Sequence, residues 1–482
     1  MKRSARYLLI APWVLLAAAC SPLGPDYVRP TFEMPQDWKT AGANEALQWL
    51  PAKPADEVLK SDWWTIFCED DLNQLEARSL QASPTLQLAL ARLDQALAQS
   101  NQRAAGLLPS VQLGASATRT RISADRPLSS YTTANTSTIQ NDFRPTLSVS
   151  YEFDWLGKVR RDVEAGRATA EQAAADQENV RLILTAQVAS GYFQLRQFDE
   201  EIAVLNELIA SQQKVLQLIG KRYALGVAGQ FELAQQNALL YSTQAQLELL
   251  KVQRNRQENA LATLSGTPAT NFHLPPGKLP AALPGIPHAL PSSLLERRPD
   301  IASVERAMAA ANAQIGVARA AYFPSLLLTP TYGGFEANQL AKLFSAPALV
   351  WSIGLAATQT LFDGGRIGAN VDLAKAGYNA TLANYRQAVL SAIQESQDAI
   401  DSLREQNLAK QKQDAAVAQQ NKAYRISLAR YREGLDNALT LAVAQQNQLA
   451  SERIRSQING SQFMTTVGLI KALGGGWGVS SN

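Results

Sequence analysis

The chain contains two copies of one structural unit. Arg222-Tyr223-Ala-Leu-Gly226 recurs 208 positions later as Arg430-Tyr431-Arg-Glu-Gly434, and Leu-Ala follows both glycines at the same distance. Leu108-Pro109-Ser110 corresponds to Phe323-Pro324-Ser325 at an offset of 215. In both halves the Pro-Ser pair opens a strand-like run, and a long helical stretch follows. Self-similarity on this scale predicts two repeats of strand, loop, strand and long helices.

The first twenty residues predict an exported chain. A basic start precedes a short apolar run over residues 7–19, which ends in Ala17-Ala18-Ala19-Cys20. Such a run is too short to span a bilayer, and small residues before a cleavage point are typical of a signal peptide, here residues 1–19. A cysteine directly afterwards is the bacterial lipoprotein pattern, although the usual leucine three positions earlier is Ala17. Cys20 is therefore the predicted lipidation site; the alternative is an ordinary signal peptide followed by a chance cysteine.

The composition argues against several classes of function. Forty-five basic and 42 acidic residues leave a net charge of +3 over 482 residues, so no nucleic-acid surface is expected. With Cys20 assigned to lipid, Cys68 has no disulfide partner and is expected to be a packed side chain or a free thiol. His273 and His288 have no nearby cysteine or acidic cluster in sequence, so no metal site is expected. Without a phosphate loop or a nucleophile beside a base, we expect no enzyme, and no cofactor besides the lipid on Cys20.

Four runs alternate between apolar and small or polar residues. They cover residues 111–118, 147–155, 326–332 and 351–357. This alternation is typical of transmembrane β-strands and also of a soluble sheet with one buried face; the signal sequence favours the membrane. Four strands cannot close a barrel, and open sheet edges are not tolerated in lipid. Three copies of the chain would supply twelve strands, which predicts a homotrimer.

Most of the remaining sequence predicts long helices. Residues 158–220 contain no proline and predict one long helix. Gly226 and Gly229 mark a turn, and residues 231–264 predict a second helix that runs back along the first. The second half repeats this pattern with residues 367–432, a turn at Gly434, and residues 439–473. Two hairpins of this length exceed a globular core and predict a helical barrel of coiled-coil pairs. A heptad-like seam is expected at Ile202, Leu205, Ile209, Gln212, Leu216 and Ile219.

Glutamines and asparagines gather on other faces of these helices. Such faces either line water or form a solvated outer surface; examples are Gln235, Gln236, Asn237, Gln445, Gln446 and Asn447. The proline-rich residues between the halves predict an irregular linker around the middle of the helical barrel. The predicted organisation is a signal peptide (1–19), an N-terminal anchor and extended segment (20–68), a first repeat (69–266), the linker (267–293), a second repeat (294–473) and a tail (474–482).

Several ordered motifs resemble one family. They are Gly24-Pro-Asp-Tyr27, Trp63-Trp64, Leu72-Asn-Gln-Leu75, Leu294-Leu-Glu-Arg297-Arg298-Pro299-Asp300-Ile301, Ile315-Gly-Val-Ala-Arg-Ala-Ala-Tyr-Phe-Pro324, Leu361-Phe-Asp-Gly364-Gly365-Arg366 and Leu473-Gly-Gly-Gly-Trp477. Together they are similar to the outer membrane factors of bacterial tripartite efflux systems, the TolC-like and OprM-like channels. The resemblance covers nearly all of the mature chain.

The resemblance implies a fold, a location and partners. The fold is an α+β membrane protein, a homotrimeric twelve-stranded barrel in the outer membrane that continues into a periplasmic helical barrel. The partners are a periplasmic adaptor and an inner-membrane pump, usually of the resistance-nodulation-division class. The implied function is a passive, gated conduit for drugs or other small toxic compounds. Two alternatives are an export channel of the type I secretion kind and a non-conducting periplasmic scaffold lipoprotein.

Two motifs have physical roles beyond recognition. Pro299 suits the first turn of a helix, and Asp300 favours the positive end of that helix. Arg297 and Arg298 are then expected to pair with acids or carbonyl groups. The glycines Gly364-Gly365 let the chain leave a strand and enter a helix at a sharp angle.

The resemblance also implies where the conduit closes. It assigns Arg430 and Tyr431 to a polar latch, Leu439 to an apolar ring, and the turns around Gly226, Gly229 and Gly434 to adaptor docking. Relatives commonly carry an aspartate four residues beyond that leucine, whereas this chain has Val443. A ring of valines is expected to seal by dewetting and to attract no cation; the alternative is that Val443 only packs between helices.

Overall fold

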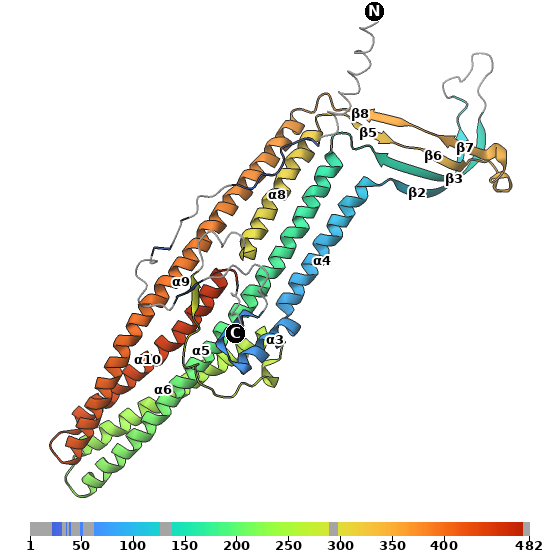
Figure 1. Cartoon of the computed structure of the whole chain (residues 1–482). Helices are drawn as coiled ribbons and strands as arrows, with labels where there is room; N and C mark the ends of the chain where they lie inside the picture. The colour runs from blue at the N-terminus through green and yellow to red at the C-terminus, as the bar shows by residue number, and fades with distance from the viewer. Residues whose placement is uncertain are drawn as a thin grey trace, which may run out of the picture. The chain divides into compact units, whose positions relative to one another are not determined.

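The computed structural model describes residues 22–30, 35, 38, 39, 49–51, 62–125, 137–288 and 297–475. The predicted signal peptide, Cys20, residues 289–293 of the linker and residues 476–482 of the tail lie outside them. The chain divides into two compact units, whose helices and strands are labelled in Figure 1. The strand unit comprises Met1–Pro30, Asp94–Ala173 and Val304–Tyr385, and the hairpin unit comprises Thr31–Leu93, Ala174–Ser303 and Arg386–Asn482. Each unit takes segments from both halves of the sequence.

The four predicted strands form one antiparallel sheet in the strand unit. β2 (Ser110–Ile122) pairs along its whole length with β3 (Thr138–Glu152), which begins earlier than expected. The third strand comprises β5 (Ser325–Leu328) and β6 (Thr331–Phe335), and the fourth comprises β7 (Leu349–Ser352) and β8 (Leu355–Thr358). β3 pairs with β5 and β6, which in turn pair with β8 and β7.

The two strands of the second half are interrupted, whereas the sequence predicted continuous runs. The breaks fall at Thr329-Pro330 and at Ile353-Gly354. Proline has no amide hydrogen for the ladder, and glycine offers no side chain to pack on the sheet surface. The ladder nevertheless continues across the breaks, because the Thr329 amide donates to the Gly354 carbonyl at 2.9 Å.

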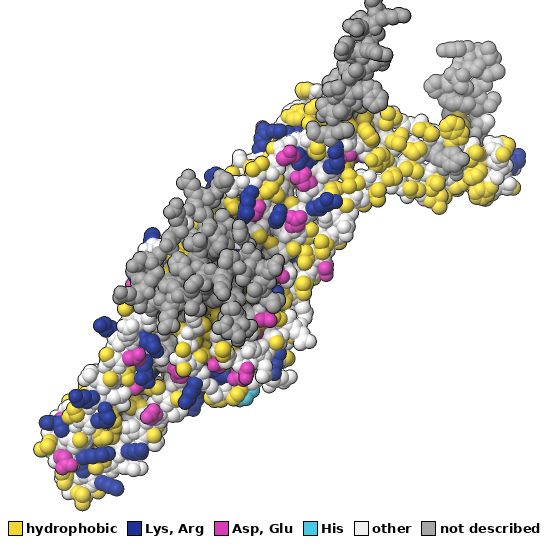
Figure 2. Space-filling view, in the orientation of Figure 1, with side chains coloured by type: hydrophobic (Ala, Val, Ile, Leu, Met, Phe, Trp, Pro, Cys, Tyr) yellow, Lys and Arg dark blue, Asp and Glu magenta, His cyan; other side chains and the backbone are white. Residues whose placement is uncertain are grey.

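Large apolar side chains on the sheet are exposed. Leu113 is 81 % exposed, Trp351 65 % and Ile353 73 %. Figure 2 shows apolar side chains over much of the visible face of the sheet. Among the described strands, β2 and the β7/β8 strand each pair on one side only. An extended apolar face with open edges is a surface that lipid or another chain must cover.

Each half passes from its sheet into a long helix through a glycine corner. Gly157 has φ +78° before α5 (Lys158–Ala224), and the predicted pair Gly364-Gly365 has φ +68° and +91° before α9 (Arg366–Arg432). Aspartates accept the first amides of both helices. Asp154 accepts from Val159 and Arg160, and Asp363 accepts from Gly365 and Ile367. The glycine corner is confirmed; the paired aspartate caps were not predicted.

The helical hairpins match their predicted limits to within a few residues. α5 turns into α6 (Gln230–Leu264), and α9 turns into α10 (Ala438–Ala472). α5 and α9 both contain 67 residues, and α6 and α10 both contain 35, so every position of the first hairpin has a counterpart 208 positions later. Shorter helices are α3 (Asp70–Ala82), α4 (Pro84–Ala104) and α8 (Pro299–Ala320). No described helix is long and apolar enough to cross a membrane.

An aromatic core lies within the hairpin unit. The Phe193 ring of α5 stacks on Phe463 of α10 at 4.9 Å, and Phe67 lies 4.7 Å from Phe193. Trp63, Phe67 and Leu72 are almost fully buried around them. Cys68 follows in a left-handed conformation (φ +54°) and is an exposed free thiol, so the packed alternative for this residue is wrong. A short parallel pair, β1 (Trp49–Pro51) with β4 (Ile286–His288), completes the unit.

The buried seam of α5 differs from the predicted one. Leu205, Gln212 and Ile219 are fully buried as expected, but Leu208 and Val215 are also buried. The predicted seam members Ile202, Ile209 and Leu216 are only partly buried. The shift arises because α5 packs against two partners at once; Leu205 and Leu208 share one cluster with residues of both α6 and α10.

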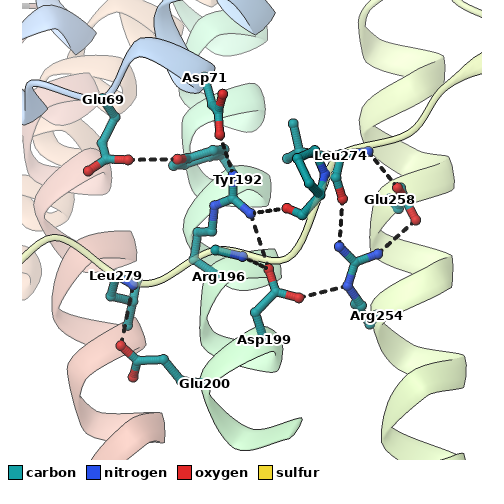
Figure 3. Close-up of polar contacts among 12 residues, drawn as sticks. Glu69, Asp71, Tyr192, Arg196, Asp199, Glu200, Arg254, Glu258, Leu274 and Leu279 are labelled. Carbon is teal, nitrogen blue, oxygen red and sulfur yellow. Dashed lines mark hydrogen bonds and ion pairs between the residues drawn. The ribbon is translucent and has the colours of Figure 1, made fainter. Parts of the chain in front are cut away.

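Four charged residues hold the linker against the first hairpin; we call Arg196, Asp199, Arg254 and Glu258 the ionic clamp (Figure 3). Arg254 donates to Asp199, to Glu258 and to the carbonyl of linker residue Leu274, all at 2.7–2.8 Å. Asp199 also accepts from the Gly277 amide, and Arg196 donates to the Pro275 carbonyl. The described part of the linker thus packs against α5 and α6.

The clamp also contacts His273 of the linker. Its Nδ1 atom lies 3.0 Å from Oε1 of Glu258. The two residues are brought together by the path of the linker over α6. Among the described residues, no group of three or more histidine, cysteine or acidic side chains is placed to hold a metal.

Candidate functional site at the hairpin tips

Glycines close both hairpin turns. Gly226 has φ +74° and Gly434 has φ +76°, the left-handed conformation that ends a helix at little cost. In the first turn the Val227 amide donates to the Arg222 carbonyl at 2.8 Å, and in the second the Leu435 amide donates to the Arg430 carbonyl at 2.9 Å. Gly229 has an ordinary φ of −86° and precedes α6. Only two of the three predicted turn glycines therefore need the freedom of glycine.

Tyr431 of the second hairpin is held by two residues of the first. Its side chain is 2 % exposed, and its hydroxyl donates to Oε2 of Glu232 at 3.2 Å. Arg222 donates from Nη1 to the Tyr431 carbonyl at 2.7 Å, and its guanidinium lies 4.8 Å from the centre of the Tyr431 ring. We call Arg222, Glu232 and Tyr431 the tyrosine latch. It connects the two hairpins within one chain.

The environment of Tyr431 keeps its hydroxyl protonated. Burial, followed by the negative charge of Glu232, raises the pKa of the Tyr431 hydroxyl above its usual value of 10.0. The hydroxyl therefore remains a donor to Glu232 throughout the neutral range. Apolar side chains surround the ring, and they are Val215, Ile219, Ala438 and Leu441, with Leu218, Leu233, Tyr424 and Leu428 beside them.

Arg430 lies apart from this latch. Its side chain is 55 % exposed, and its Nε atom lies 3.5 Å from Oδ2 of Asp436 in the same turn. Nη2 donates to the Leu435 carbonyl at 3.3 Å. The Asn437 amide, followed by the Thr440 side chain and the charge of Arg430, lowers the pKa of the Asp436 carboxyl. Within one chain, Arg430 braces its own turn, whereas its counterpart Arg222 makes the contact between hairpins.

Leu439 and Val443 lie one turn apart on α10 and are exposed. Leu439 is 51 % exposed and Val443 46 %. The described helices of its own chain therefore do not bury Val443. Other apolar side chains at the tips are more exposed still, and they are Leu225, Val227, Phe231 and Leu435. Such an apolar surface marks a place where the chain meets another molecule or another copy of itself.

Arg298 fulfils the structural role expected of its motif. It is 6 % exposed and donates to both carboxylate oxygens of Asp300, to Glu395 of α9 and to the Ala472 carbonyl at the end of α10. α8 begins at Pro299, as predicted. The expected pairing with acids and carbonyl groups is thus confirmed for Arg298. Arg297 lines an adjacent cavity of about 380 Å³.

Sequence reasoning missed two of the three residues of the tyrosine latch. Arg222 was visible as part of the repeat, but nothing marked it as a contact to the second hairpin, and Glu232 carried no signal. Their counterparts in the second hairpin are Arg430 and Thr440. A comparison of the two copies shows that the acid exists only in the first, which is the one sequence signal available.

Comparisons with known proteins agree with this architecture. Residues 75–267 and 290–475 match the outer membrane efflux protein family. The pyoverdine export outer membrane protein OpmQ of Pseudomonas putida is 33 % identical over 99 % of this chain and 98 % of its own length. Outer membrane protein OprJ of Pseudomonas aeruginosa is 30 % identical over 98 % of this chain and 95 % of its own length.

Solved structures are similar over almost the whole chain. The outer-membrane channel OprN aligns with a TM-score of 0.87 and 29 % identity, covering 94 % of this chain and 99 % of that one. The Campylobacter jejuni CmeC outer membrane channel aligns with a TM-score of 0.85 and 27 % identity, covering 96 % of each chain.

Proposed function

Because the chain belongs to the outer membrane efflux protein family, we propose that it is the channel subunit of a tripartite efflux pump, a passive gated conduit for small toxic compounds. The observation that carries the proposal is the four-stranded sheet, apolar on an exposed face and open at both edges, followed by two long hairpins. A sheet of this kind is stable in lipid only when its edges are closed. Three copies close them in a twelve-stranded barrel.

The remaining components follow from the same proposal. A lipid on Cys20 holds each chain to the outer membrane. A periplasmic adaptor contacts the turns around Gly226, Gly229 and Gly434, and an inner-membrane pump of the resistance-nodulation-division class supplies the energy. Relatives are named for the export of pyoverdine and for toluene efflux, which supports small exported molecules as the substrate class.

The alternatives have less support. A type I secretion channel would use the same barrel, and no observation on this chain favours protein over small molecules. A periplasmic scaffold needs no exposed apolar sheet. Opening of the proposed conduit shifts a two-state equilibrium of the hairpins, and a partner shifts it by binding one state more tightly than the other. The tyrosine latch favours the closed state because it joins the two hairpins.

Replacement of Arg222 by methionine is expected to raise the open fraction more than tenfold. The change removes a charge-assisted hydrogen bond to the Tyr431 carbonyl and a cation–π contact, which together contribute about 2 kcal/mol. Single-channel recording in a planar bilayer measures the open fraction. Lys221→Met is the control, because it removes an exposed cation from the neighbouring position of the same helix. Equal effects of the two variants would contradict the latch.

Replacement of Val443 by aspartate is expected to create block by divalent cations. Val443 is exposed on α10, and a trimer would present three carboxylates together where the native chain presents apolar groups. Conductance is measured against added divalent cation. Val443→Asn is the control, because it adds polarity without charge and should change conductance without adding block. Unchanged block in the aspartate variant would exclude Val443 from the constriction.

A further inference from the structure

Three glutamines meet inside the hairpin unit; we call Gln212 of α5, Gln236 of α6 and Gln445 of α10 the glutamine layer. Their exposures are 0 %, 2 % and 0 %. The expectation that Gln236 and Gln445 face water is therefore wrong, whereas Gln446 is exposed. The burial arises because the two hairpins pack against each other along this stripe, which periodicity within one helix does not reveal.

The layer connects the two hairpins through hydrogen bonds. Gln236 donates from Nε2 to Oε1 of Gln445 at 3.4 Å and to the Gln212 carbonyl at 3.5 Å. Gln212 donates from Nε2 to Oγ1 of Thr243 at 3.0 Å. Two further atoms are buried without a hydrogen-bond partner among the described residues: the acceptor Oε1 of Gln212 and the donor Nε2 of Gln445.

The layer lies between two apolar clusters. Towards the tips is the cluster around the tyrosine latch, with Ile219 and Leu441 fully buried. On the other side is a cluster that includes Leu205, Leu247 and Leu449. A polar layer in an apolar coiled coil fixes the register of its helices, because any other register buries more unpaired groups. If fixing the register were the only role of the layer, every donor and acceptor in it would be expected to be paired. One donor and one acceptor are not.

The two unpaired atoms are chemically complementary. A buried amide N–H and a buried amide oxygen that both lack a hydrogen-bond partner raise the free energy of this arrangement of the hairpins. They belong to different hairpins, so a displacement of α10 against α5 can change the distance between them. An arrangement in which they bond to each other would have no unpaired group from this set.

We propose that the glutamine layer is a two-position register element between the hairpins. In the first position, described above, Gln236 bridges the hairpins while Gln212 Oε1 and Gln445 Nε2 are unpaired. In the second position these two atoms bond to each other. The layer raises the free energy of the first position and thereby counteracts the tyrosine latch. Its consequence for conduction rests on the proposed function; the two positions themselves do not.

Replacing Gln212 by methionine is expected to favour the first position, because the second position then loses its defining hydrogen bond. In Gln212→Met, Thr243 keeps its bond to the Leu239 carbonyl, and Gln236 keeps both of its acceptors, the Gln212 carbonyl and Oε1 of Gln445. The open fraction in bilayer recordings should fall about tenfold, equivalent to about 1.4 kcal/mol. Gln236→Met is the control in the same layer: it removes paired donors, so it should not lower the open fraction. An unchanged open fraction in Gln212→Met would overturn the proposal.

A cross-linking experiment tests the positions without conduction. Val215→Cys/Leu441→Cys, one turn towards the tips on α5 and α10, leaves the glutamines in place and is prepared with Cys68→Ser in the full chain. Under a mild oxidant in detergent, disulfide formation needs the two α-carbons within about 7 Å, so its rate reports how often α5 and α10 meet beside the layer. Adding Arg222→Met should change the rate about tenfold, and adding Gln212→Met should reverse that change. Equal rates in all three backgrounds would overturn the two-position layer. A rate that depends on Gln212 in a protein that never conducts would retain the layer and reject the channel.

Discussion

Replacement of Arg254 by methionine is expected to lower the free energy of unfolding by about 3 kcal/mol, because Glu258 loses its arginine partner and the buried Asp199 keeps one of its two, Arg196. Arg254 donates to Asp199, which is almost fully buried, to Glu258 and to the Leu274 carbonyl (Figure 3). Without Arg254, these three acceptors lose a charged donor at once. The linker over the first hairpin should then detach before the helices unfold.

The second hairpin provides the control for this result. The counterparts of Asp199, Arg254 and Glu258, 208 positions later, are the uncharged Asn407, Gln462 and Thr466, and the counterpart of Arg196 is Arg404. Three of the four charges of the clamp are thus confined to the first hairpin. Gln462→Met replaces a buried side chain at the matching place and should change stability by less than about 1.5 kcal/mol. Thermal denaturation measures stability, and limited proteolysis measures linker release. Equal destabilisation by the two variants would show that the clamp has no special role.

Replacement of Glu76 by glutamine is expected to stabilise the protein by about 3 kcal/mol at pH 7. Glu76 of α3 is fully buried, and neither carboxylate oxygen has a hydrogen-bond partner among the described residues. Burial raises the pKa of its carboxyl from 4.5 to about 9. The folded protein therefore holds a proton that the unfolded chain releases at neutral pH, and stability falls by about 1.4 kcal/mol for each pH unit between these two values.

The pH dependence distinguishes this cause from a general packing effect. Below pH 4.5 both states are protonated, and Glu76→Gln should equal the native protein. Between pH 4.5 and pH 9, the stability that the glutamine variant gains over the native protein should grow steadily. Glu248→Gln is the control, since Glu248 is exposed and pairs with Lys251 on the same helix. Melting temperatures recorded from pH 5 to 9 check the prediction. A gain that does not change with pH would mean that Glu76 is not neutral in the folded state.

Local patterns were sufficient to predict the elements of the fold. The alternation at residues 111–118 and 147–155 predicted β2 and β3, because the side-chain period of a strand is two. Gly226 and Gly434 located the hairpin turns, because only glycine readily takes the left-handed conformation there. The breaks at Pro330 and Gly354 could have been predicted, since both residues weaken a ladder.

The contacts between elements could not be predicted in the same way. Periodicity indicates which residues share a face of one helix, but not which other helix covers that face. Gln236 and Gln445 therefore read as solvated residues, although the packing of two hairpins buries both. Arg222 and Tyr431 are 209 positions apart, and no local signal joins them. Family resemblance placed Tyr431 at the constriction, but its partners required the packed structure.

The central claim is that this chain forms a passive conduit closed by its own hairpins. The most direct test is single-channel recording of the purified, lipid-bearing full chain in a planar bilayer, beside Arg222→Met. The proposed function predicts rare discrete openings for the native protein and openings more than tenfold as frequent for the variant. A folded trimer that shows no conductance in either form would contradict it and favour the scaffold.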